Sequence, residues 1–232
     1  MDGFNPQILA HAFIWFVAFL FSTTCHEAAH AVVAKIGGDE TAAEQVTLNP
    51  VPHMQREPWG MIVVPIVTLI MSKGSSLMGW ASAPFDPTWE RRHPHRSAWM
   101  ALAGPATNFT LMFLAVLGLR IGFANNWLAM PTYDHENFAF TVLLIFFELN
   151  LLLGIFNLIP APPLDGSTGI MVFMPVETAH RYLDWLRSSP YVNLGLLIAI
   201  LIMYHFYGRL EYAIAKLLLG DVLHLSASIV PI

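Results

Sequence analysis

The sequence predicts an all-α polytopic membrane protein with about four transmembrane helices and a short re-entrant or β-hairpin segment. Of its 232 residues, 56% are hydrophobic and only 12% are charged, about half the charged share of a soluble globular domain. Four long apolar segments each approach the ~20 residues needed to cross a ~30 Å hydrocarbon core. The net charge is −5 and the chain holds no basic block, so we expect no nucleic-acid partner.

The predicted spans cover residues 8–33, 98–123, 139–159 and 192–207. No basic region and no small-residue cleavage site precede the first span, so it is expected to be retained rather than removed as a signal peptide. The stretch "MIVVPIVTLIM" at 61–71 is too short to span and holds a proline and β-branched residues. It is therefore predicted to be a re-entrant or interfacial segment, with a small hairpin as one form that it could take. An amphipathic tail is expected after the fourth span.

The distribution of basic residues predicts the orientation. Between the first two spans the chain carries Lys35, Arg56, Lys73, Arg91, Arg92 and Arg96, whereas residues 124–138 and the N-terminal segment carry no lysine or arginine. By the positive-inside rule, loops 36–97 and 161–191 are expected in the cytoplasm. We expect residues 1–232 to form a single membrane-embedded domain.

The stretch "TTCHEAAHAVV" at 23–33 places ionisable residues at the end of the first span. His26 and His30 are four residues apart, so on a helix they share a face and can hold one metal ion. Glu27 lies beside them and could deprotonate a zinc-activated water, as in the HExxH arrangement. Ionisable side chains are energetically costly in an apolar span, so their presence indicates a functional site. The alternative is an interfacial helix end whose histidines simply meet water.

A hydrolytic zinc site usually has three protein ligands and an open position. After the third span, the stretch "FNLIPAPPLDGSTG" at 156–169 contains three prolines that end a helix, followed by Asp165. Because the first and third spans run in the same direction, both motifs are expected near the same membrane face. Asp165 is the predicted third ligand. The alternative is a proline-rich exit loop with a solvated aspartate.

Other polar residues are weaker candidates. Glu148 could be a ligand in principle, but about 25 Å of helical rise separates it from Asp165. Polar side chains of neighbouring spans could satisfy it, such as Ser22, Thr23, Thr107 and Asn108, or it could stay protonated. Cys25 is expected to be a packing residue. The loop histidines are expected to be solvated or interfacial: His53, His93 and His95.

Together the motifs resemble those of a known family, the site-2 proteases, which are intramembrane zinc metalloproteases. The motifs are "HEAAH", then "ALAGPATN" at 101–108, then "NLIPAPPLDG". The loop stretches "TLNPVPHMQREPWG" and "GWASAP" are similar to the compact branch of the family. No PDZ-like insertion lies between the motifs. The resemblance covers most of residues 20–170.

The resemblance implies one Zn2+ per chain, held by His26, His30 and Asp165, with Glu27 as the catalytic base. It also implies that Asn157 lies near the active site and holds the substrate backbone or the oxyanion. The expected partners are the lipid bilayer and a membrane protein substrate with a transmembrane helix, which must unwind before it is cut. If residues 61–71 formed a sheet edge, they could pair with the unwound strand. The expected location is a multi-pass position in a prokaryotic cell membrane, with the site near the cytoplasmic face.

Two other functions would use the same ligands. A zinc transporter, or another metal-binding membrane protein, would favour ligands near the bilayer midplane and often a second site, whereas this sequence offers one site near one face. A structural protein with a stabilising zinc would close the fourth coordination position with another histidine or cysteine, and none is well placed. The sequence predicts no oligomeric state.

Overall fold

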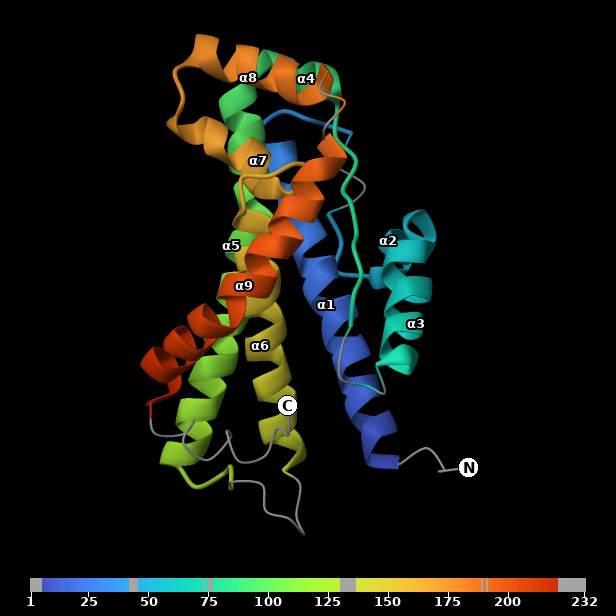
Figure 1. The fold of residues 1–232 in the computed structure, drawn as a ribbon, viewed down its shortest axis with the longest axis vertical. Coiled ribbons are helices and arrows are strands. Elements are labelled where there is room, and N and C mark those ends of the chain that lie inside the picture. Colours follow the sequence, from blue (N-terminus) through green and yellow to red (C-terminus); the bar gives the residue numbers. More distant parts are fainter. Residues whose placement is uncertain are drawn as a thin grey trace.

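The computed structural model describes residues 6–41, 46–72, 74, 77–129, 137–188, 190 and 192–220, and these residues contain helices but no strand. Within these ranges, four helices are long and apolar enough to cross a membrane: α1 (Pro6–Ile36), α5 (Pro94–Ala124), α6 (Phe138–Leu158) and α9 (Val192–Leu219). In Figure 1, α1, α5 and α6 run along the long axis of the molecule and α9 crosses beside them. The predicted fold class, an all-α multi-pass membrane protein, is confirmed.

The first three long helices match the predicted spans to within a few residues at either end. The fourth differs, because α9 continues twelve residues beyond residue 207, to Leu219. Arg209, Glu211 and Lys216 lower the hydropathy of this part without breaking a helix, since all three are compatible with helical backbone. Much of the predicted tail is therefore the second half of α9.

Residues 61–71 are helical rather than a β-hairpin. A π-helical turn, η2 (Trp59–Val63), leads directly into α3 (Val64–Met71). Pro65 stands in the first turn of α3, where a residue without an N–H is tolerated. The hairpin alternative is wrong, and with it the sheet edge expected there. The re-entrant position of this segment stays a prediction.

The core is built around α5, which packs most extensively against α6 and α1. One apolar cluster joins α5, α6 and the end of α9, with Met112, Leu119 and Phe147 fully enclosed. A second cluster joins α1 to α6 through Phe19 and Leu149. The remaining length of α9 is largely uncovered by protein, with 11% of its most apolar window buried.

Short helices fill the two connections predicted to be cytoplasmic. The first connection holds α2 (Pro50–Arg56), η2, α3 and α4 (Pro87–Arg92), and the second holds α7 (Asp165–Gly169), η3 (Ile170–Phe173) and α8 (Val176–Ser188). Both α2 and α4 start with an Asn or Asp cap followed by proline, a favourable helix start. Figure 1 shows α4 and α8 together at one end of the bundle, and an extended segment running beside α1 towards α4.

Candidate metal centre

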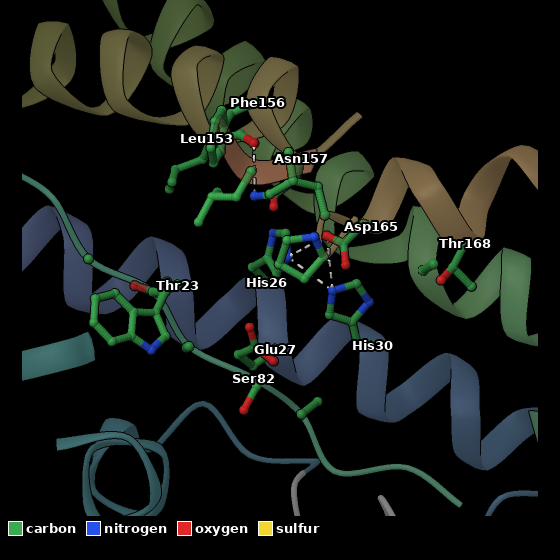
Figure 2. A pocket seen from close by; sticks show the side chains of 18 of the residues that line it. Thr23, His26, Glu27, His30, Ser82, Leu153, Phe156, Asn157, Asp165 and Thr168 are labelled. Carbon is green, nitrogen blue, oxygen red and sulfur yellow. Dashed lines mark hydrogen bonds and ion pairs between the residues drawn. The ribbon is translucent and has the colours of Figure 1, made fainter. Parts of the chain in front are cut away.

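Two histidines of α1 and one aspartate from α7 converge on one point (Figure 2). The Nε2 atoms of His26 and His30 lie 3.0 Å apart. Asp165 Oδ2 lies 3.1 Å from His26 Nε2 and 3.4 Å from His30 Nε2. Among the described residues, this is the group of His, Cys, Asp and Glu side chains that could hold a metal ion. The structure thus brings together the three predicted ligands.

The atoms that meet in this group favour a cation. His30 Nδ1 lies 2.7 Å from the Met100 carbonyl oxygen. A carbonyl can only accept, so Nδ1 carries the proton and Nε2 of the neutral ring carries a lone pair. That lone pair faces a second imidazole nitrogen and a carboxylate. Tetrahedral zinc, with bonds of ~2.0–2.1 Å, separates its ligand atoms by about 3.3 Å, close to the distances in this group.

Asp165 reaches α1 because α6 ends just before it. Pro160, Pro162 and Pro163 follow the last turn of α6, and the chain folds back so that Asp165 is the first residue of α7. Asp165 stands at the start of α7, so its carboxylate meets the Nε2 atoms of both histidines of α1.

Gly104 of α5 leaves the space in which the two imidazoles lie. A Cβ atom added at Gly104 would come within 2.4 Å of His26 Nε2 and 2.5 Å of His30 Nε2. Real Cβ atoms do not approach other atoms so closely, so a side chain here would displace the ligands. Gly104 belongs to the "ALAGPATN" stretch, and its proximity explains why that stretch needs a residue without a side chain.

Glu27 lies beside the group without belonging to it (Figure 2). Its side chain is enclosed, with 3% of the residue exposed. Glu27 Oε2 is buried without a hydrogen-bond partner in the described part of the chain. A buried unpaired carboxylate oxygen is costly, so this atom requires a proton, a water or a bound group. The position suits a base that acts on water at the metal.

A cavity of about 710 Å³ opens in front of these residues. Asn157 lines it, and the amide nitrogen of Asn157 donates to the Leu153 carbonyl oxygen (3.0 Å). Residues 78–83 of the extended segment 77–83 form the opposite wall, and Leu196 and Ile200 of α9 also line the cavity. The structure thus places Asn157 at the same cavity as Glu27, with its amide oxygen outside that hydrogen bond.

The structure also corrects several weaker predictions. His53 is fully buried rather than solvated, and burial lowers its pKa. Three of the four polar residues that could satisfy Glu148 have other partners: Ser22 and Asn108 bond to Asn150, and the Thr23 hydroxyl donates to the Phe19 carbonyl. Sequence reasoning missed Asn150. An asparagine within an apolar span was the available signal.

Comparison with known proteins gives a family match over most of the chain. The family model for Peptidase family M50 matches residues 14–203, a range that includes the three residues of the metal-ligand group, Glu27 and Asn157. No solved structure matches the chain significantly.

Two named relatives cover the same region. The chain is 34% identical over 164 residues to "Putative zinc metalloprotease YwhC" of Bacillus subtilis (strain 168), which is 68% of either chain. It is 28% identical over 181 residues to "Putative zinc metalloprotease Rip2" of Mycobacterium tuberculosis, in strains Erdman and H37Rv. That match covers 77% of this chain and 65% of the relative, so this chain spans about two thirds of the length of its relatives.

Proposed function

Because the chain belongs to peptidase family M50, we propose that it is a zinc metalloprotease that cuts peptide bonds within or beside transmembrane segments of membrane proteins. The family membership confirms the predicted resemblance to site-2 proteases and the predicted class of enzyme, a metallopeptidase. Zinc is the metal named for its relatives. The substrate and the control of cleavage are the proposed part.

The observation that carries this proposal is the group of two buried imidazoles and a half-buried carboxylate, with Glu27 Oε2 beside it buried and without a partner in the described part of the chain. His26, His30 and Asp165 supply three ligands of the types zinc prefers and leave a fourth position for water or substrate. The open cavity in front of them gives a substrate room to reach that position. A site with an adjacent free base and an open position suits hydrolysis better than storage or transport of the metal.

We assign the reaction to the three ligands of the metal-ligand group and to Glu27, with Asn157 in a supporting role. Bound zinc would polarise the scissile carbonyl and lower the pKa of water towards ~7. Glu27 accepts the proton of the attacking water and returns it to the leaving amine. Asn157 faces the same cavity. Its amide oxygen can accept a hydrogen bond from the substrate backbone, and the second N–H of its amide, beside the one that bonds to the Leu153 carbonyl, can donate to the developing oxyanion.

The extended segment 77–83 is proposed to hold the unwound substrate. Its even-numbered residues are bonded towards α2, η2 and α3: Met78 N–H to Thr68, Trp80 N–H to the Gly60 carbonyl, and the Ser82 carbonyl to Arg56. In extended backbone, alternate residues direct their N–H and C=O groups to opposite edges. The backbone groups of Gly79, Ala81 and Ala83 therefore form the other edge, where no partner exists among the described residues, and a substrate strand could pair with it.

The cytoplasmic face is proposed for the site. The group of ligands lies towards the end of the bundle that carries Lys35 at the end of α1, Arg91 and Arg92 on α4, and Arg96 at the start of α5. Basic residues near span ends favour the cytoplasmic side. Substrates that enter through the lipid would meet the apolar side chains of Leu196 and Ile200 at the cavity.

The test compares wild type with Glu27→Gln, purified in lipid, on a single-span membrane protein whose products are identified by mass spectrometry. We expect both proteins to hold about one zinc per chain. We expect the variant to cut at least about 100-fold more slowly, because general-base catalysis contributes about 10²–10⁴. Equal cleavage by both would exclude Glu27 as the base. Zinc uptake into vesicles without any cleavage would favour a transporter.

A further inference from the structure

A chain of buried side-chain hydrogen bonds leads from His26 through three helices. His26 Nδ1 lies 2.6 Å from Asn108 Oδ1, and Asn108 Nδ2 donates to Asn150 Oδ1 (2.9 Å). Asn150 Nδ2 in turn donates to Ser22 Oγ (2.9 Å). Ser22, Asn108 and Asn150 are fully buried. The residues come from α1, α5 and α6, so this polar relay crosses the centre of the bundle.

The direction of the relay is determined at its far end. Asn150 Nδ2 also donates to the Phe146 carbonyl oxygen (2.9 Å). A backbone carbonyl can only accept, so the amide nitrogen of Asn150 must face it and the amide oxygen must face Asn108. Asn108 therefore presents its nitrogen to Asn150 and its oxygen to His26. An amide oxygen beside His26 Nδ1 requires that Nδ1 carry the proton.

We propose that Asn108 and Asn150 are positioning residues that hold His26 as the Nδ1–H tautomer, with the lone pair of Nε2 directed at the metal. Partners that bond to the outer nitrogen of a ligating histidine fix its tautomer and orientation. The proposal rests on the zinc site of the proposed function and adds residues that touch neither metal nor substrate. The same tautomer is set at His30 by the Met100 backbone carbonyl, which no side-chain substitution removes.

The depth of the relay explains why it is built from two amides. Each buried donor or acceptor left unpaired in an apolar core destabilises the fold. An amide can accept from one neighbour while donating to the next, so two asparagines extend the anchoring carbonyl of Phe146 to His26 without an unpaired group. Loss of either asparagine would free the His26 ring to rotate or to change tautomer.

The first test compares two nearly isosteric variants, Asn108→Leu and Asn108→Asp. Both fill the same space, but only aspartate offers an oxygen to His26 Nδ1. Aspartate loses the bond to Asn150, yet both of its carboxylate oxygens accept, so it needs no partner to turn an oxygen towards His26. We expect Asn108→Leu to weaken zinc binding about 10–100-fold, as for other partners of ligating histidines. Asn108→Asp should bind within about threefold of wild type. Zinc affinity is measured by chelator competition, and the visible spectrum of the Co2+-substituted protein reports the ligand geometry.

The second test asks whether the two asparagines act as a unit. Asn150→Leu should also weaken zinc binding, and the double variant with Asn108→Leu should be no weaker than Asn108→Leu alone, since coupled residues are non-additive. Thr24→Val is the control. It removes a buried hydroxyl from the same helix as Ser22, but this hydroxyl donates to the Leu20 carbonyl (2.6 Å), away from the relay. Thr24→Val should leave zinc affinity unchanged.

A merely structural role predicts a different result. In that case Asn108→Leu would lower the unfolding temperature of the zinc-free protein while zinc affinity and the Co2+ spectrum stayed at wild-type values, which would overturn the proposal. Equal loss of affinity in Asn108→Leu and Asn108→Asp would overturn it too. If wild type itself bound no zinc, the proposed function would fail first, so the two failures are distinguishable.

Discussion

Gly104 shows how one missing side chain shapes the metal centre. It stands in the middle of α5, where glycine is normally unfavourable by roughly 0.5–1 kcal/mol relative to alanine. The same position leaves room for the Nε2 atoms of His26 and His30. The helix gives up some stability so that two imidazoles of α1 can approach its backbone. A side chain at this residue would therefore stabilise the helix but disturb the metal-ligand group.

We expect Gly104→Ala to weaken zinc binding at least about tenfold, as displaced ligand geometry does, while the helix itself becomes no less stable. The matched control is Gly118→Ala on the same helix, where the new Cβ would meet only the flexible end of Leu143, at 3.1 Å. Chelator competition measures zinc affinity for both variants. Tight zinc binding by Gly104→Ala would contradict the crowding argument.

Residues whose role depends on local spacing were predictable. The four-residue interval between His26 and His30 predicts a shared helix face from helical geometry alone. Asp165 required the order of the spans together with the family resemblance. Asn150 could not be assigned, because an asparagine in an apolar run shows that a polar group is buried but not which groups it meets. The partners of Ser22 and Asn108 depend on how three helices pack.

The extended segment 77–83 contributes at the scale of an element. It is held along one edge by α2, η2 and α3 and lines the cavity with the other. Gly79 allows this close fit, since a Cβ atom there would lie 2.4 Å from the Phe19 ring and 2.6 Å from the Gly60 carbonyl. The role first expected of residues 61–71, a free backbone edge for substrate, is proposed instead for this segment.

We expect Ala81→Pro to slow cleavage about three- to tenfold, the loss of one backbone hydrogen bond of about 0.5–1.5 kcal/mol. Proline suits extended backbone and removes the N–H of Ala81, which has no hydrogen-bond partner among the residues that the structure describes. Zinc content should stay at the wild-type level. Ala81→Ser keeps the N–H and is the control. A serine variant as slow as the proline variant would show that the side chain matters rather than the backbone edge.

Elements were predictable where hydropathy and length agree. Three spans follow from uninterrupted apolar runs, and α5 contains Pro105 without ending there. The extent of α9 was underestimated because charged residues reduce hydropathy without opposing a helix. Residues 61–71 were ambiguous because a short apolar run with β-branched residues fits a strand or a helix. The structure places these residues in η2 and α3.

At the scale of the whole molecule, α4 and α8 close one end of the bundle (Figure 1). Two ion pairs join them. Arg187 Nε donates to Glu90 Oε2 (2.9 Å), and Glu90 is 1% exposed and also accepts from Ser97. Arg91 pairs with Asp184 at 3.0 Å with both side chains mostly exposed. The buried pair therefore links the two predicted cytoplasmic connections beside the cavity, which Glu90 and Arg187 line.

We expect Arg187→Ala to lower the free energy of unfolding by about 1–3 kcal/mol, because it leaves the buried Glu90 carboxylate short of a partner. Arg91→Ala removes the other pair between the same helices and should cost under about 1 kcal/mol, as exposed ion pairs do. Denaturant unfolding in detergent measures both. Equal losses would mean that burial of Glu90 does not decide the strength of this link.

The central claim is that one zinc ion joins α1 to α7 through His26, His30 and Asp165. Zinc-edge X-ray absorption on the purified wild-type protein tests it most directly. The predicted spectrum shows one zinc per chain with two imidazole nitrogens and further oxygen ligands at ~2.0–2.2 Å, and no sulfur at ~2.3 Å. Protein that binds no zinc, or zinc without imidazole ligands, would contradict the claim.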